Sequence, residues 1–170
     1  MSFSPVPQYS FRELTDIAPE FLKRLGVRLL MLDLDNTVAA YSEHSPSSGV
    51  ALWVADIKGH DIKMVIVSNS VRVGRVEEFA KALQIDFIKG AAKPSPKCVT
   101  QIMKESGFSP DETALVGDQI FTDTLAANRA GVVSIVIRPR RFTNPFLALR
   151  YALEAPFRVI CRNKFRNSEF

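Results

Sequence analysis

The sequence has no long hydrophobic run. Its longest stretch without Asp, Glu, Lys or Arg is the 12-residue segment His44–Ala55, whereas a membrane-spanning helix needs about 20 predominantly apolar residues. The first residues, Met1–Ser10, also lack the basic start and apolar run of a secretory signal peptide. We therefore expect a chain with neither a membrane span nor a signal peptide.

Cysteine is scarce as well. Cys98 and Cys161 are the two cysteines among 170 residues, and their wide separation matches neither a metal-binding pair nor a disulfide framework. This usage is typical of a reducing, cytoplasmic compartment. Hydrophobic residues make up 46% of the chain, which excludes intrinsic disorder, and the length suits one domain over residues 1–170.

Basic charge is concentrated towards the C-terminus. Residues 138–170 contain eight basic and two acidic residues, while residues 1–137 contain 14 basic and 16 acidic ones. The eight are Arg138, Arg140, Arg141, Arg150, Arg158, Arg162, Lys164 and Arg166. This basic tail indicates an anionic partner such as lipid or nucleic acid, or else a solvated helix with arginines extended along its surface.

Apolar runs alternate with helical patterns along the chain. Residues 28–33, 63–68, 113–117 and 132–137 are typical of buried strands, and residues 85–88 are a shorter candidate. Strands separated by helices predict parallel crossover units. We therefore expect an α/β fold in three layers, with a Rossmann-like, doubly wound parallel sheet.

Local signals predict where some helices begin. Ser95-Pro96 is typical of an N-cap followed by proline at the first helical position, and Ser109–Glu112 has the capping-box pattern. Residues 1–27 are expected to pack as an N-terminal helical arm. The apolar stripe that suggests it consists of Leu14, Ile17, Phe21, Leu22 and Leu25.

Polar side chains follow the predicted strands, at the sheet edge where such folds bind ligands. The first strand ends in Asp33-Leu-Asp35-Asn-Thr37. If the strand persists, Asp33 and Asp35 point the same way and repel, unless a cation or a proton offsets the repulsion. The alternative is an ordinary turn rich in Asp and Asn.

The later strand ends carry further polar groups. Ser68-Asn69 could bind a phosphoryl oxygen or cap a helix. Lys93 leads into a helix N-terminus, where anions are favoured, or is a solvated surface lysine. Gly117-Asp118 supplies another carboxylate, while Asp123 either joins the site or is a first-turn helix acid.

Taken together, these groups suit Mg²⁺ and phosphate, because Mg²⁺ prefers carboxylate oxygens together with waters and phosphate. Their order resembles the haloacid dehalogenase superfamily of phosphohydrolases over residues 25–140. The matching motifs are Asp33-x-Asp35-x-Thr37, Ser68, Lys93 and Gly117-Asp118-x4-Asp123.

One branch of that superfamily is especially similar. Residues 117–124, 128–131 and 17–27 resemble the YqeG-type branch of subclass IIIA, which includes mitochondrial phosphatases for phosphatidylglycerophosphate. The resemblance implies Mg²⁺-dependent hydrolysis of phosphomonoesters, with phosphatidylglycerophosphate or another large phosphate ester as substrate.

The resemblance also implies a role for each motif residue. Asp33 is the nucleophile and Asp35 the general acid and base. The metal ligands are the Asp33 and Asp118 carboxylates and the Asp35 main-chain carbonyl. Ser68, Asn69 and Lys93 bind the phosphoryl group. Asp123 orients Lys93 or completes the metal shell, with Thr37 and Gly117 in supporting positions.

The spacing of the motifs leaves no room for a cap domain. The 32 residues between Asp35 and Ser68 must already supply a flap, a helix and a strand, and the 24 between Ser68 and Lys93 suffice for a helix and a short strand. An open site suits a large or membrane-bound substrate, or needs a partner to exclude water.

The basic tail also carries bulky apolar residues. They are Phe142, Phe146, Leu147, Leu149, Tyr151, Leu153 and Phe157. Mixed with arginines, they suit a peripheral helix on anionic membrane lipid, or plain packing of a C-terminal helix against the sheet. Nucleic acid is not indicated by the core.

Other interpretations remain open at this stage. A non-catalytic module could hold phosphate and Mg²⁺ and dock on RNA or membrane through the tail, but it has no need of the second carboxylate, Asp35. A phosphoaspartate receiver domain would place its phosphate-accepting Asp on a later strand than its acid pair, whereas here Asp33 and Asp35 follow one strand. A phosphotransferase would share the aspartyl-phosphate intermediate.

Overall fold

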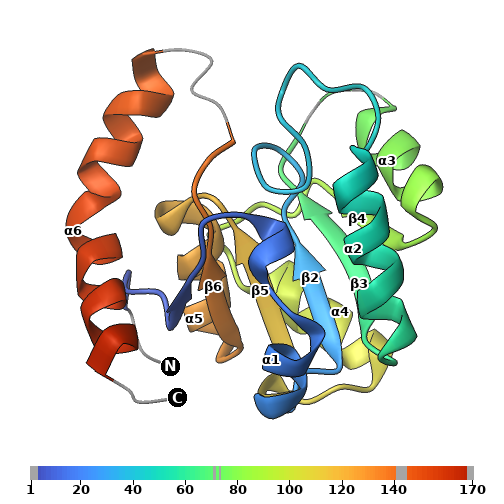
Figure 1. Ribbon diagram of the computed structural model, residues 1–170, viewed down its shortest axis with the longest axis horizontal. Coiled ribbons are helices and arrows are strands. Elements are labelled where there is room, and N and C mark those ends of the chain that lie inside the picture. The colour runs from blue at the N-terminus through green and yellow to red at the C-terminus, as the bar shows by residue number, and fades with distance from the viewer. Residues whose placement is uncertain (1–3, 71, 73, 141–144, 168–170) are drawn as a thin grey trace.

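The computed structural model describes residues 4–70, 72, 74–140 and 145–167, with side chains up to residue 161. Its centre is a parallel sheet of six strands in the order β1-β6-β5-β2-β3-β4 (Figure 1). The strands are β1 (Tyr9–Ser10), β2 (Leu29–Leu32), β3 (Lys63–Ser68), β4 (Asp86–Lys89), β5 (Thr113–Gly117) and β6 (Val133–Val136). All five predicted strands are present, with ends within a residue of expectation.

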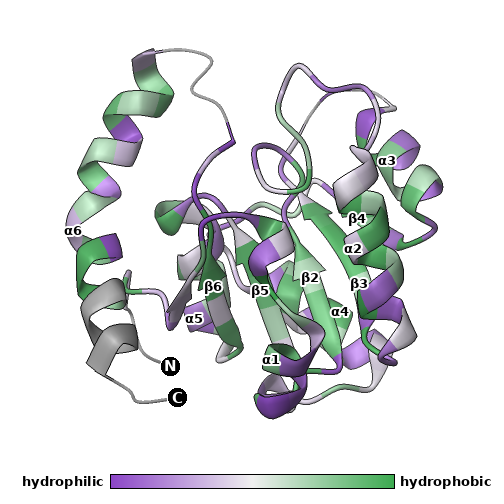
Figure 2. Cartoon of the chain, viewed as in Figure 1, coloured by the Kyte–Doolittle hydropathy of each residue, from purple (hydrophilic) through white to green (hydrophobic). Residues whose placement is uncertain are grey.

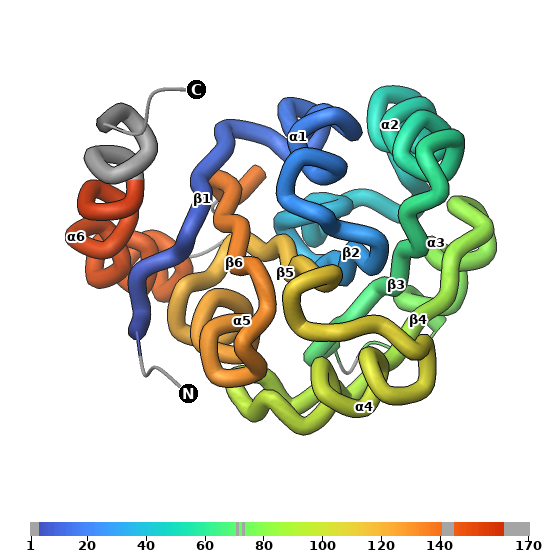
Figure 3. Tube along the Cα trace, turned by 90° about the horizontal axis from the view of Figure 1, so that it is seen from below, coloured from blue at the N-terminus to red at the C-terminus, as the bar shows by residue number. Residues whose placement is uncertain are grey.

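Helices cover both faces of this sheet, which makes the three layers of the expected α/β fold. Figure 3 shows α1 (Pro19–Arg24) and α2 (Ser48–Gly59) on one side and α4 (Lys97–Ser106) and α5 (Leu125–Ala130) on the other. The remaining helices are α3 (Arg75–Leu83), near β4, and the long α6 (Pro145–Asn167), beside β1.

The hydrophobic core is divided by the sheet. Leu30 and Leu32 of β2 join the cluster under α2 and α3, while Leu29 and Met31 join the cluster under α4 and α5. Successive residues of a strand point to opposite faces, so a strand buried on both sides must be continuously apolar. This is why β2 and β5 stand out as hydrophobic in Figure 2.

The N-terminal segment differs from the expected helical arm. It contains the short strand β1, which pairs with β6, a 3₁₀ turn η1 (Leu14–Asp16) and α1. The predicted apolar stripe does pack against the body, but the prediction of a continuous helical arm is wrong. Pro19 starts a new helix, and the residue before a proline, Ala18, is extended.

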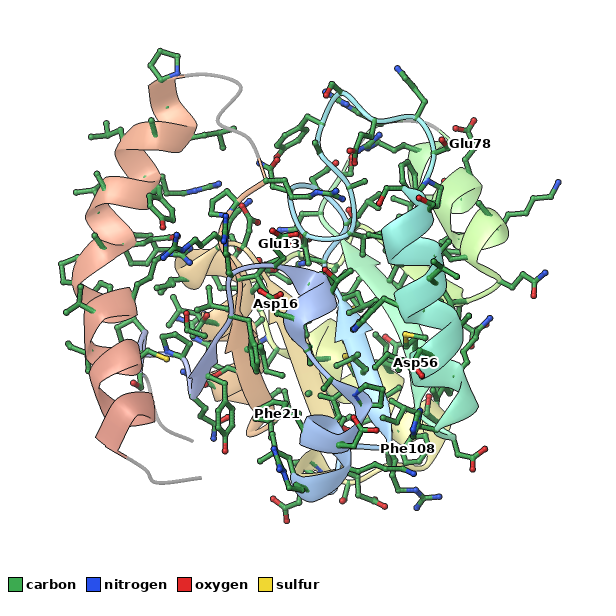
Figure 4. All side chains as sticks on the ribbon, in the orientation of Figure 1. Glu13, Asp16, Phe21, Asp56, Glu78 and Phe108 are labelled. Carbon is green, nitrogen blue, oxygen red and sulfur yellow. The ribbon has the colours of Figure 1, made fainter. Side chains whose placement is uncertain are left out.

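Aromatic packing and one hydrogen bond fix this segment on the body. The ring of Phe21, labelled in Figure 4, meets the rings of Tyr9 and Phe11 edge to face at centroid distances of 5.1 and 5.0 Å. The indole nitrogen of Trp53 in α2 donates to the Ile17 carbonyl at 2.8 Å. The segment therefore closes the α2 side of the sheet.

The two predicted helix starts have different outcomes. Ser109 and Glu112 form the expected capping box, at the 3₁₀ turn η2 (Pro110–Glu112). Helix α4 begins one residue later than expected, with Pro96 as the N-cap. The Ser95 hydroxyl still accepts a hydrogen bond from the Lys97 N–H at 3.4 Å.

The intervals between the motifs hold the expected small elements. Residues 36–47 form a loop before α2, and α3 and β4 lie between Ser68 and Lys93. In the described part of the chain neither interval contains a cap domain. The described helices include none that is long and apolar enough to cross a membrane.

Candidate active site

Three carboxylates converge at the carboxyl edge of the sheet. Asp33 directly follows β2, and Asp118 directly follows its neighbour β5. Asp123 comes from the π-helical turn η3 (Ile120–Thr124). One oxygen of each carboxylate lies within 4.8 Å of the others, and all three residues are buried. Buried like charges at this spacing need a cation or protons between them.

Lys93 supplies part of that positive charge. Its Nζ lies 2.7 Å from Asp33 Oδ1 and 2.6 Å from Asp123 Oδ1, and it donates to the Val67 carbonyl at 2.7 Å. The lysine side chain is 1% exposed, so the surface-lysine alternative is wrong. Burial opposes its charge, but Asp123 and Asp33 outweigh this and raise the pKa of Lys93.

The remaining carboxylate charge is unbalanced. Burial is the main cause that raises the pKa of Asp33 to about 7, against the opposing effect of Lys93. Burial, with help from Asp33 and Asp123, also raises the pKa of Asp118 well above its usual range. A buried cation would remove this penalty.

The donor set fits such a cation. Asp33 Oδ2 and Asp118 Oδ1 are buried and have no hydrogen-bond partner among the described residues. Carboxylate oxygens are the ligands of hard divalent ions, and Mg²⁺ is usually held by one or two carboxylates together with waters and phosphate. The cluster is therefore a candidate metal site.

Asn69 and Ser68 lie beside Lys93, at the end of β3. The Asn69 amide pairs twice with the Lys93 backbone, donating to its carbonyl at 2.9 Å and accepting from its N–H at 3.0 Å. Ser68 is buried, and its hydroxyl accepts a hydrogen bond from the Ser70 N–H at 3.0 Å. In this structure the Asn69 side chain thus fixes the backbone of Lys93.

Gly117 allows Asp123 to approach the strand end. A Cβ atom at residue 117 would lie 2.3 Å from the Asp123 carboxyl carbon, far inside van der Waals contact. The Asp123 carboxylate also accepts from the Gln119 N–H at 3.2 Å. Glycine is therefore required here by close packing, and Asp123 is both an acid of the first turn of η3 and a member of the carboxylate cluster.

Asp35 lies in different surroundings from Asp33. Its Oδ1 accepts a hydrogen bond from Arg75 Nε of α3 at 3.0 Å, and both side chains are largely buried. Arg75 also donates to the Glu43 carbonyl and, at 2.8 Å, to the Ala40 carbonyl. One guanidinium thus joins Asp35 to the loop of residues 36–47.

Asn36 and Thr37 complete the first motif. Asn36 has a φ of 64°, a left-handed conformation that asparagine tolerates better than most residues, and its N–H donates to the Ala39 carbonyl at 2.7 Å. Thr37 is buried. It lies on the wall of a separate pocket of about 450 Å³, which also involves Arg138 and Arg140.

Helix α6 reaches the site from its side. Asp118, Asn36 and Arg150 line one small crevice next to α6. The Arg150 charge acts to lower the pKa of Asp118 against the larger effect of burial, and it acts in the same sense on Tyr41. Helix α6 therefore brings the basic Arg150 and the acidic Glu154 to the edge of the site.

Fold and site together define an α/β enzyme with a buried carboxylate and lysine cluster at the carboxyl edge of a parallel sheet. Residues 7–131 match the family of haloacid dehalogenase-like hydrolases. The chain is 31% identical over 142 residues to "Probable phosphatase YqeG" of Bacillus subtilis (strain 168), covering 84% of this chain and 82% of that protein. The chain belongs to the haloacid dehalogenase-like family and is a phosphatase-type hydrolase.

A second curated relative has a named lipid substrate. The chain is 29% identical over 159 residues to "Phosphatidylglycerophosphate phosphatase 1, chloroplastic/mitochondrial" of Arabidopsis thaliana, and it spans 43% of that protein's length. Because the chain belongs to a family of hydrolases, the alternative of a non-catalytic module that only holds phosphate and Mg²⁺ is set aside.

Solved structures show the same fold at low identity. The cobalt-bound deoxy-D-mannose-octulosonate 8-phosphate phosphatase of Haemophilus influenzae aligns with a TM-score of 0.54 at 16% identity, covering 68% of this chain and 70% of its own. The corresponding enzyme of Moraxella catarrhalis, in complex with magnesium ion, phosphate ion and KDO, aligns with a TM-score of 0.51 at 16% identity, covering 69% and 80%.

The structure brings the predicted motif residues to one edge of the sheet, but it also adds residues that sequence reasoning missed. These are Arg75 on α3 and the pair Glu154 and Arg158 on α6. Arg75 stands 40 residues from its partner Asp35. No local pattern marks such a contact, since an arginine in a helical segment is usually a solvated one.

Proposed function

We propose that the chain hydrolyses phosphomonoesters with bound Mg²⁺, through an aspartyl-phosphate at Asp33. The observation that carries this proposal is the buried Asp33, with one oxygen on Lys93 and the other without a described partner, facing Asp118. A carboxylate held this way can attack phosphorus while the surrounding positive charge balances the phosphate.

In the first step, an Asp33 oxygen attacks phosphorus and the bond from phosphorus to the ester oxygen breaks. Asp35 gives its proton to the departing oxygen. In the second step, Asp35 takes a proton from water, the water oxygen attacks phosphorus, and the bond to Asp33 breaks with release of inorganic phosphate. The first step requires Asp35 near the ester oxygen and the second requires it near the attacking water, and Arg75 would fix the Asp35 side chain for both.

The Asp33 and Asp118 carboxylates and the Asp35 main-chain carbonyl would hold Mg²⁺. The ion would offset the repulsion between Asp33 and the incoming phosphate. Lys93, the Ser68 hydroxyl and the backbone near Asn69 would bind the phosphoryl oxygens. Asp123 fixes Lys93 through their ion pair, which keeps the ammonium group near phosphorus.

The substrate we propose is a lipid phosphate such as phosphatidylglycerophosphate. Three observations support it: the absence of a cap over the described site, the basic Arg150 at its edge, and the likeness to a phosphatidylglycerophosphate phosphatase. A site without a cap admits a phosphate group that remains attached to a membrane. Arg150 offers a charge for a second anionic group of the same substrate.

The outer face of α6 supports a peripheral contact with anionic lipid, on the cytoplasmic side of a membrane. Phe146, Leu149, Leu153 and Ile160 recur at helical spacing and are 72, 59, 60 and 43% exposed. Figure 4 shows side chains projecting from α6 both towards the body and away from it. The sequence adds Arg162, Lys164 and Arg166 to the same helix, as in helices that bind anionic membranes.

A substrate comparison tests the catalytic proposal. Phosphate release is measured with Mg²⁺ from an aryl phosphate, a phosphoprotein and phosphatidylglycerophosphate in mixed micelles, beside the Asp33→Asn variant. We expect Mg²⁺-dependent release by the wild type alone, fastest with the lipid. If Asp33→Asn released phosphate as fast as the wild type, the role of Asp33 would be refuted. If the wild type hydrolysed the other two phosphates but not phosphatidylglycerophosphate, the proposed substrate would be refuted.

Vesicle sedimentation tests the membrane contact. We expect the wild type to bind phosphatidylglycerol vesicles but not phosphatidylcholine vesicles. Replacing Leu149 and Leu153 together by Asp should abolish binding and leave turnover of an aryl phosphate unchanged. Leu52→Asp, at a residue of α2 that is 72% exposed, is the matched control. Binding that survives the double change would overturn the contact.

A further inference from the structure

Helix α6 carries a buried ion pair on the face that meets the body. Glu154 and Arg158 are 1% and 7% exposed, and Arg158 Nη2 lies 3.0 Å from Glu154 Oε2. Removing two charges from water is costly unless their remaining hydrogen-bonding atoms also find partners. The partners of this pair therefore indicate what the burial serves.

Three of those partners are backbone groups of the segment that follows β5, and the fourth, at Ile137, follows β6. Glu154 Oε1 accepts from the Ile120 N–H at 2.9 Å and from the Phe121 N–H at 3.3 Å. Arg158 Nη2 donates to the Asp118 carbonyl, and its Nη1 donates to the Ile137 carbonyl at 2.9 Å. The pair thus binds the chain immediately after the candidate metal ligand Asp118.

The same segment carries both late carboxylates of the cluster. Asp118 stands before η3 and Asp123 within it. The first N–H groups of a helical turn have no partner inside the turn, and the Glu154 carboxylate satisfies two of them. Phe157 adds an edge-to-face contact with Phe121, at a centroid distance of 6.0 Å. These contacts of α6 add to the hydrogen bond from the Gln119 N–H to the Asp123 carboxylate at the same turn.

We propose that Glu154 and Arg158 are positioning residues for the metal site: they hold the backbone from Asp118 to Phe121 so that the Asp118 carboxylate faces Asp33. This inference rests on the proposed function, because it assumes that the carboxylate cluster binds Mg²⁺. It extends the site beyond residues 7–131, the part matched by the family. The basic tail is then part of the active site.

The test is Mg²⁺ affinity, measured by calorimetry on folded protein without substrate. Residues outside the first ligand shell typically change metal affinity by about 10- to 100-fold when altered. We expect Glu154→Ala and Arg158→Met each to weaken Mg²⁺ binding by about that factor. Val159→Ala, at an exposed position of the same helix next to Arg158, should leave the affinity unchanged.

A conservative variant separates positioning from mere attachment of the helix. Glu154→Gln keeps an oxygen that can accept from the Ile120 N–H but removes the charge. We expect it to remain folded by circular dichroism and to retain Mg²⁺ affinity better than Glu154→Ala, and it serves as the test if the alanine variant does not fold. Intermediate affinity supports positioning.

Two results overturn the inference in distinguishable ways. If the wild type and all folded variants bind Mg²⁺ equally well, the pair only attaches α6 to the body and the proposed function stands. If the wild type itself binds no Mg²⁺, the candidate metal site is wrong and the positioning role fails with it.

Discussion

Asp33 and Asp35 leave the same strand in close succession, yet their surroundings are opposite. Asp33 faces other carboxylates, and burial raises its pKa to about 7. Asp35 faces the guanidinium of Arg75 and, through it, the loop of residues 36–47. The cluster around Asp33 holds three carboxylates against the single charge of Lys93, whereas Asp35 is matched by one arginine, Arg75.

The proposed mechanism gives these two identical side chains different roles, because Asp33 attacks phosphorus and Asp35 transfers protons. Environment, and not residue type, separates a carboxylate that attacks from one that transfers protons. In this structure the separation is made by the elements behind each residue: β5 and η3 for Asp33, and α3 for Asp35. Changes to the surroundings of Asp35 should therefore leave Mg²⁺ binding intact, and changes to the surroundings of Asp33 should leave proton transfer by Asp35 intact.

The largest effect expected from such a change is that of Asp35→Asn. The amide cannot transfer the proton, and general acid–base catalysis typically contributes about 100- to 10,000-fold. We expect kcat to fall within that range while Mg²⁺ affinity changes by less than about threefold, because the main chain is the proposed ligand. Steady-state kinetics measures the fall in kcat, and calorimetry measures the Mg²⁺ affinity. Lost Mg²⁺ affinity would refute the role of the Asp35 main-chain carbonyl as a metal ligand.

Gly117→Ala should instead disturb the carboxylate cluster around Asp33. The new methyl group would collide with Asp123 at 2.3 Å, so the ion pair between Asp123 and Lys93 must move. We expect Mg²⁺ affinity and kcat/KM each to fall by about 10- to 100-fold. Gly49→Ala, where a Cβ would meet no atom within 4 Å, is the control. An unaffected Gly117→Ala enzyme would contradict the packing argument.

Mg²⁺ affinity should also depend on pH, through Asp33 and Asp118. Burial raises the pKa of Asp33 to about 7 and that of Asp118 above its usual range, so protons must leave these carboxylates before Mg²⁺ binds. Affinity should therefore weaken as pH falls below about 7, by up to about tenfold per pH unit for one proton. Calorimetry at several pH values measures this slope, and affinity independent of pH between 5 and 7 would contradict it.

The smallest effect concerns Arg75→Lys. Lysine keeps the positive charge near Asp35 but cannot reproduce the forked bonds to Ala40 and Glu43. We expect kcat to fall by about tenfold through misplacement of Asp35, with unchanged Mg²⁺ affinity. Arg28→Lys, which alters an exposed pair with Glu112, is the control. A loss of Mg²⁺ affinity in Arg75→Lys would show that the surroundings of Asp33 and those of Asp35 are not independent.

The sheet and its edge could be predicted because each rests on a local pattern. Four of the predicted strands are mainly apolar runs, and parallel strands place their carboxyl ends together, so the residues that directly follow β2 and β5, Asp33 and Asp118, meet at one edge. The two-residue strand β1 is too short to leave such a pattern. The broken helical arm, by contrast, was foreseeable from Pro19.

The supporting contacts could not be predicted, because they join distant segments. Glu154 lies 34 residues from its partner Ile120, and its helix looked like a basic tail in the sequence. The excess charge indicated an anionic partner or a solvated helix, but Arg158 is buried against the body. Only the arrangement of α6 shows which charges face the site and which residues face outwards.

The most direct test of the division between Asp33 and Asp35 is mass spectrometry of enzyme quenched with acid during turnover of an aryl phosphate, whose leaving group needs little protonation. Asp35→Asn should accumulate one phosphoryl group on the peptide that contains Asp33, because hydrolysis lacks its base, and Asp33→Asn should carry none. A phosphoryl group on another residue, or turnover by Asp33→Asn at the wild-type rate, would contradict the account.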